Sequence, residues 1–145
     1  MKRNPTPDQV RALRAMLELV EVGWGLDNPA YRQLFTSAFI PDASPEQAGW
    51  FNEHERMCTT PEMAARLIDS FGPIDVTEYA ARVRCPTLVL HRQGDLRVPF
   101  EEGRMVASLI SKARFVPVEG RNHVVLEGEP AFQRIFAEIR QFLGG

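Results

Sequence analysis

The sequence has few cysteines, and neither of them lies in a recognisable metal-binding pattern. The two, Cys58 and Cys85, are far apart and form no Cys-x-x-Cys or Cys/His zinc spacing. A chain of 145 residues also needs no disulfide framework to fold. We therefore predict two free, buried thiols and neither a metal nor another cofactor.

Long apolar runs and blocks of one charge are absent as well. No run approaches the roughly 20 apolar residues of a membrane span, and the N-terminal stretch MKRNPTPDQ has no apolar segment of the kind that a secretory signal needs. The 17 basic and 19 acidic residues give a net charge of −2 and are spread along the chain. We expect a cytoplasmic protein with no membrane or nucleic-acid partner.

What the sequence does contain is, first, one type of helix start used three times. Thr6-Pro7-Asp8, Ser44-Pro45-Glu46 and Thr60-Pro61-Glu62 each place an N-cap hydroxyl before a proline and a carboxylate. Gln9 and Gln47 complete a capping box in the first two. The sequence predicts a helix beginning at each of these positions.

The first 84 residues are predicted to be almost entirely helix and loop. The first helix should end at Gly23, and a shorter one should begin after Asp27 or Asn28, with Pro29 in its first turn. We expect residues 1–84 to form one segment, distinct from residues 85–145.

After residue 84 the pattern changes to alternating strands and helices. Residues 85–90, CPTLVL, are apolar on both faces, which is typical of a strand covered on both sides in a parallel sheet. A helix within 99–110, a second strand at 114–119 and a final helix with an apolar face follow. These elements predict an α/β fold with a small parallel sheet built on a βαβ unit.

One proline indicates where this sheet should continue. Pro117 cannot donate a ladder hydrogen bond, so its strand belongs at a sheet edge. The first strand then needs a neighbour on its other side, and the sequence offers no third strand. Because two parallel strands alone are poorly stabilised, we expect the exposed edge of strand 87–91 to join a second copy in a homo-oligomer or a missing N-terminal half.

Two polar residues follow the two strands at positions that suit a site. Asp95 lies in the loop after the first strand and His123 in the loop after the second. Open α/β sheets bind ligands at the carboxyl ends of their strands. Each residue also has a simpler interpretation, Asp95 as an ordinary turn aspartate and His123 as a solvent-facing loop histidine.

Three stretches carry a resemblance to a known family: PTLVLHRQGDLRVP, ARFVPVEGRNH and EGEPAFQRIFAEIRQFL. Together they resemble the C-terminal part of an α/β-hydrolase, and residues 1–84 look like the end of the cap that covers such sites. GWGLDNPAYRQLF and FIPDASPEQ are similar to hydrolase-like domains that accompany bacterial regulatory proteins. The resemblance implies that Asp95 is the acid and His123 the histidine of a Ser/His/acid triad.

The first member of such a triad is not found. The sequence has no G-x-S-x-G motif and no serine on a glycine-flanked elbow. We expect a hydrolase of small-molecule substrates, acting on an ester or related bond, that carries acid and histidine but no nucleophile and is inactive alone. The alternative is a non-catalytic regulatory, dimerisation or apolar-ligand-binding module.

Other residues receive weaker interpretations. His54 and Cys58, four apart, suggest a thiol nucleophile, which we rank third. His91 is interpreted as the end of a strand without a role. Glu127 and Glu129 are expected to favour the N-terminus of the last helix through its dipole. The aromatic residues before position 52 could line a pocket but are more often core: Trp24, Tyr31, Trp50 and Phe51.

Overall fold

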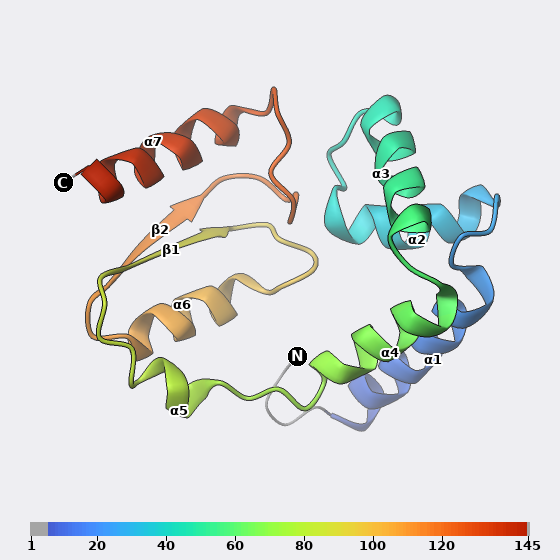
Figure 1. The fold of residues 1–145 in the computed structure, drawn as a ribbon, viewed down its shortest axis with the longest axis horizontal. Helices are drawn as coiled ribbons and strands as arrows, with labels where there is room; N and C mark the ends of the chain where they lie inside the picture. Colours follow the sequence, from blue (N-terminus) through green and yellow to red (C-terminus); the bar gives the residue numbers. More distant parts are fainter. Residues whose placement is uncertain (1–5, 145) are drawn as a thin grey trace. The chain divides into compact units, whose positions relative to one another are not determined.

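The structure is a computed structural model that describes residues 6–144. Within these residues five helices precede the first strand, and the remaining elements alternate (Figure 1). The helices are α1 (Pro7–Gly23), α2 (Pro29–Phe39), α3 (Pro45–Cys58), α4 (Pro61–Phe71), α5 (Thr77–Ala80), α6 (Phe100–Leu109) and α7 (Pro130–Gly144); the strands are β1 (Thr87–Arg92) and β2 (Ala113–Val118). The described residues form two compact units, 6–37 with 44–75 and 38–43 with 76–144. No helix within 6–144 is long and apolar enough to cross a membrane.

The predicted helix starts are confirmed. Thr6 and Ser44 each accept a hydrogen bond from the backbone N–H three residues later and complete a capping box, and Thr60 accepts one from Met63. At α2, the Asn28 side chain accepts the Ala30 N–H at 3.0 Å. Each cap satisfies an N–H group that the first helical turn leaves without a partner, so these starts are set by local sequence.

The first unit is an all-helical assembly in which α1 packs on α4. Its core is formed by Val20, Phe35, Ala64 and Ala65. Trp24 packs against Phe35 with ring centroids 5.5 Å apart. Aromatic residues therefore contribute to this core, although Trp50 remains 61% exposed.

The second unit contains the sheet. β1 and β2 pair in parallel, with α6 packed on one face and α7 on the other (Figure 1). The core of this unit lies between the sheet and α7. It contains residues of that helix and four strand residues that face it: Leu88, Leu90, Val116 and Val118. On the opposite face Phe115 packs against a phenylalanine of α6. Helices thus cover both faces of β1, as its continuous apolar run predicts.

Within the described residues both outer edges of this two-stranded sheet lack a neighbouring strand, and the edge of β1 exposes backbone donors. Thr87 donates to Lys112 and Gln93 donates to Val118, so the alternating N–H groups of Leu88 and Leu90 point away from β2. Within residues 6–144 no strand pairs with that edge. The same register turns the nitrogen of Pro117 away from β1, which confirms the predicted edge position of β2.

The predicted burial of the two thiols is wrong. Cys58 and Cys85 are both free, as expected, but both are exposed. Cys58 is the last residue of α3, and Cys85 lies in the loop before β1, so neither reaches a core. The predicted boundary at residue 84 stays a prediction.

Candidate active site

Asp95 lies in the turn that follows β1, where backbone N–H groups converge on its carboxylate. Its Oδ1 accepts hydrogen bonds from Arg97 N at 2.7 Å and Val98 N at 2.9 Å. The side chain is only 5% exposed. Burial opposes ionisation, but the hydrogen bonds from His123, Val98 and Arg97 outweigh it and hold the pKa of Asp95 below its usual 3.8. Asp95 is thus a turn aspartate and a buried carboxylate at once.

His123 meets the second oxygen of this carboxylate. Its Nδ1 lies 2.8 Å from Asp95 Oδ2. An ionised carboxylate only accepts, so Nδ1 carries the proton and Nε2 is left as the basic nitrogen. The His123 backbone N–H donates to Phe39 O at 2.7 Å, and the two rings meet edge to face at 5.8 Å. Residues 28 positions apart therefore form one hydrogen-bonded pair.

The pair borders a cavity of about 280 Å³. This volume is close to the lower end of the roughly 300–1,000 Å³ typical of small-molecule sites. The cavity lies around the end of β1 and is lined by Leu90, His91, Arg92, Asp95, Val98, Val118, His123, Val125 and Ile135. Apolar walls with a few polar groups suit a small, largely apolar substrate.

His91 also lines this cavity, although we predicted no role for it from the sequence. Its Nε2 donates to Val98 O at 3.0 Å and lies 3.9 Å from Asp95 Oδ2. A Cβ at Gly103 in α6 would stand 2.3 Å from His91 Nδ1, so the ring rests directly on that glycine. His91 fixes the far end of the acid-bearing turn. Only the alternation of side chains along β1 could have indicated a role for His91, because it places His91 on the opposite face from Leu90.

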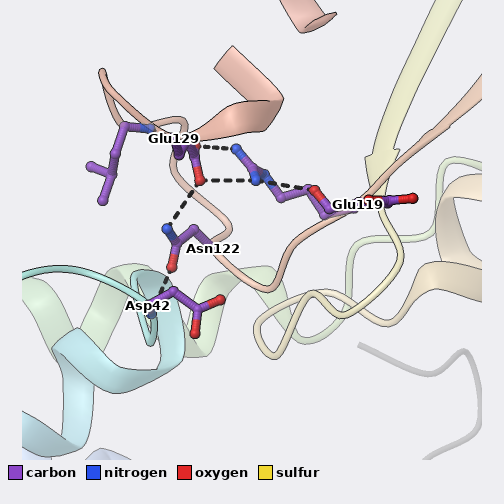
Figure 2. A network of polar contacts seen from close by, with 6 residues as sticks. Asp42, Glu119, Asn122 and Glu129 are labelled. Atoms are coloured by element: carbon purple, nitrogen blue, oxygen red, sulfur yellow. Dashed lines mark hydrogen bonds and ion pairs between the residues drawn. The ribbon is translucent and has the colours of Figure 1, made fainter. Parts of the chain in front are cut away.

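A buried polar network beside the histidine loop was also missed. Arg92, 5% exposed, makes a bidentate ion pair with Glu129, and one of its contacts is 3.1 Å long. Asn122 lies between Glu129 and Asp42 (Figure 2). Glu129 also accepts Leu126 N at 2.8 Å, so it holds the loop together rather than acting only on the helix dipole.

The residues that line this cavity include no serine or cysteine. Ser37, Ser70 and Ser108 donate to carbonyls of their own helices, and Ser44 is an N-cap. Cys58 Sγ lies 3.4 Å from His54 Nε2 on α3, in the other compact unit. Within residues 6–144 no group of three or more His, Cys, Asp or Glu side chains could hold a metal ion.

We compared the sequence and the structure with those of known proteins. No protein-family profile matches the chain. It is 38% identical over 88 residues to a non-heme chloroperoxidase of Kitasatospora aureofaciens, covering 60% of this chain and 32% of that protein. A hydrolase from Pseudomonas aeruginosa matches with a TM-score of 0.74 at 19% identity, over 99% of this chain and 52% of the other.

Two further solved structures match in the same way. A bromoperoxidase from Bacillus anthracis gives a TM-score of 0.68 at 23% identity, over 90% of this chain and 49% of its own. A thermophilic esterase from Thermogutta terrifontis gives 0.68 at 22% identity, over 99% and 53%. At these identities the similarity establishes the fold, and the chain spans about half the length of each structure. The chain has a partial α/β-hydrolase fold, consistent with the C-terminal half of that fold.

Proposed function

We propose that this chain provides the acid and the histidine of an α/β-hydrolase active site that cleaves an ester or related bond. The observation that carries the proposal is the 2.8 Å contact between His123 Nδ1 and the buried carboxylate of Asp95. This hydrogen-bonded pair borders a cavity of about 280 Å³, close to the size of small-molecule sites. The similar structures include a hydrolase and an esterase, which agrees with this class of reaction.

In this mechanism His123 is the general base. Its Nε2 takes a proton from a nucleophilic hydroxyl as the hydroxyl attacks the substrate carbonyl, and later returns the proton to the leaving group. Asp95 keeps the proton of the resting ring on Nδ1 and stabilises the imidazolium that forms. The two backbone donors on Asp95 Oδ1 keep Oδ2 directed at the ring.

The nucleophile in this proposal comes from polypeptide outside residues 1–145. The open edge of β1 supports this source, because Leu88 and Leu90 offer N–H groups to a neighbouring strand beside the cavity. A strand paired there would bring its own carboxyl end to His123. We propose this strand-bearing segment as the partner of the chain.

The test measures hydrolysis of p-nitrophenyl acetate in two samples. One contains the chain alone, and the other also contains the segment of the Pseudomonas hydrolase that lies outside the region matched by this chain. We expect no rate above buffer for the chain alone and a clear rate for the mixture. Asp95→Asn and His123→Ala should each remove that rate. Asp69→Asn and His54→Ala, which change exposed groups of the other unit, are the matched controls.

Two results would contradict the proposal. Hydrolysis by the chain alone that Cys58→Ser abolishes would place the nucleophile at Cys58. An active mixture that keeps its full rate after His123→Ala would remove His123 from the reaction. If the mixture shows no association by light scattering, the same assay is run on the chain linked to that hydrolase segment as one polypeptide.

A further inference from the structure

The loop that carries His123 is built on a buried cation. Arg92 is the last residue of β1 and points to the α7 face, opposite to His91. Its guanidinium makes a bidentate ion pair with Glu129 and donates to Glu119 O at 3.4 Å. The Arg92 side chain therefore contacts both ends of the loop between β2 and α7, at Glu119 and at Glu129.

The loop also passes very close to this arginine. Gly120 has a φ of 113°, and a Cβ there would lie 2.6 Å from Arg92 Nη1. Only glycine takes this backbone conformation readily and leaves room for the guanidinium. The close approach means that a shift of Arg92 is transmitted directly to the loop.

Asn122 connects this ion pair to the residue next in sequence, His123. It is 3% exposed, its Nδ2 donates to Glu129 Oε2 at 3.2 Å, and its Oδ1 accepts the Asp42 N–H at 2.9 Å (Figure 2). Both ends of the amide are therefore bound on opposite sides. A buried amide satisfied in this way has one orientation, because turning it over would set donor against donor and acceptor against acceptor.

We infer that Asn122, held by Arg92 and Glu129, is the positioning residue of His123. The inference rests on the proposed function, in which His123 is the base. The network fixes the residue before His123, and Phe39 O accepts the N–H groups of His123 at 2.7 Å and of Val124 at 3.3 Å. Two adjacent residues of β1 thus hold the two loops of the site. His91 holds the turn that carries Asp95, and Arg92 holds the loop that carries His123.

The test reads the protonated ring nitrogen of each histidine by long-range proton–nitrogen NMR on the full chain. The chain contains three histidines, so their signals can be assigned by substitution. In the unchanged protein His123 should carry its proton on Nδ1, facing Asp95, and His91 on Nε2, facing Val98 O. Asn122→Ala should cause loss of the pure Nδ1–H pattern of His123 and leave the pattern of His91 unchanged.

A milder variant keeps the test decisive if Asn122→Ala fails to fold. Glu129→Gln keeps one of the two side-chain oxygens, which accept from Asn122 and Leu126 separately, and removes the charge that holds Arg92. It should also convert the His123 ring to a mixture of tautomers. Glu127→Gln, an exposed residue of the same loop, is the control and should leave the pattern intact.

An unchanged His123 pattern in a folded Asn122→Ala or Glu129→Gln protein would overturn the inference. So would a loss in Glu127→Gln equal to that in Glu129→Gln. Because this readout needs neither nucleophile nor substrate, it can fail while the hydrolysis assay succeeds. Conversely, a correctly held His123 in a mixture without hydrolysis would count against the proposed function alone.

Discussion

The carboxylate of Asp95 links local backbone geometry to the proposed chemistry. It accepts two N–H groups of its own turn and one ring N–H from a distant loop. The first two contacts would form in any turn aspartate, and the third is what makes the residue part of a site. Charge at Asp95 should therefore matter for stability as well as for the proposed reaction.

This charge predicts a pH dependence of stability. The folded-state pKa of Asp95 lies below 3.8, so ionised Asp95 contributes stability above that pH and loses it as the pH falls through the folded-state value. Asp95→Asn should lower the free energy of unfolding at pH 7 by about 1.5–3 kcal/mol, the range for a hydrogen bond to a charged group. The difference from the unchanged protein should shrink below pH 3.8 in urea titrations.

A control separates this effect from the general effect of acid. Asp69→Asn removes an exposed carboxylate of α4. Its difference from the unchanged protein should stay small across the same titrations. A difference for Asp95→Asn that stays constant from pH 7 to the acid limit would contradict the prediction.

Gly103 gives a second prediction at the scale of single residues. A Cβ at this position would lie 2.3 Å from His91 Nδ1, so Gly103→Ala should push His91 away from Val98. We expect a loss of about 1–3 kcal/mol in unfolding free energy, as for other overpacked sites. The measurement is thermal or urea unfolding, together with loss of the Nε2–H signature of His91.

Gly49 is the matched control for this substitution. It is also a helical glycine, but a Cβ there would meet nothing within 4 Å. Gly49→Ala should therefore stabilise the protein by about 0.5–1 kcal/mol through helix propensity alone. Equal effects at both glycines would show that the contact with His91 has no energetic weight.

The pairing of Asp95 with His123 could be predicted from the sequence, whereas most of the surrounding residues could not. The resemblance to α/β-hydrolases implied this pair, and the topology agrees, because both members follow strands of one βαβ unit. The Arg92–Glu129 ion pair joins residues 37 apart whose types give no sign of the pairing. The position of Arg92 at the end of an apolar strand could have predicted only that it has an acidic partner, because a buried arginine needs one.

At the scale of elements, helix starts are the most local feature of this chain. Ser44 and Thr60 each cap a helix, but only Ser44 has a capping box, because Gln47 lies at the third helical position of α3 while Met63 has that place in α4. Such signals lie within four residues, which is why the sequence predicted the helix starts correctly. Burial depends on distant residues, and the expectation for Cys58 and Cys85 was wrong for that reason.

These caps should have measurable weight. Ser44→Ala and Thr60→Ala should each lower the free energy of unfolding by about 0.5–2 kcal/mol, since each leaves a helical N–H without its acceptor. Urea unfolding followed by circular dichroism measures the loss. Thr59→Ala is the control, because the Met63 N–H donates to the hydroxyl of Thr60. A Thr59→Ala loss as large as that of Thr60→Ala would contradict the capping account.

At the scale of the whole molecule, the sheet is the incomplete part. The first unit has a closed core around Val20, which is fully buried, whereas no residue of β1 before Arg92 is fully buried. Helices cover both faces of β1, so the exposure comes with the unpaired edge. The sequence predicted this open edge through the position of Pro117.

The open edge makes a final prediction about amide exchange and self-association. Leu88 and Leu90 direct their N–H groups outward, while the same alternation directs Val89 and His91 toward β2. In dilute solution the first two amides should exchange with deuterium much faster than the second two. At high concentration light scattering should detect a dimer joined at this edge, and the Leu88 and Leu90 amides should become protected. Adding a segment that pairs with β1 should abolish the dimer and keep the protection, because both compete for one edge. Dimers in which these two amides still exchange freely would place the interface elsewhere.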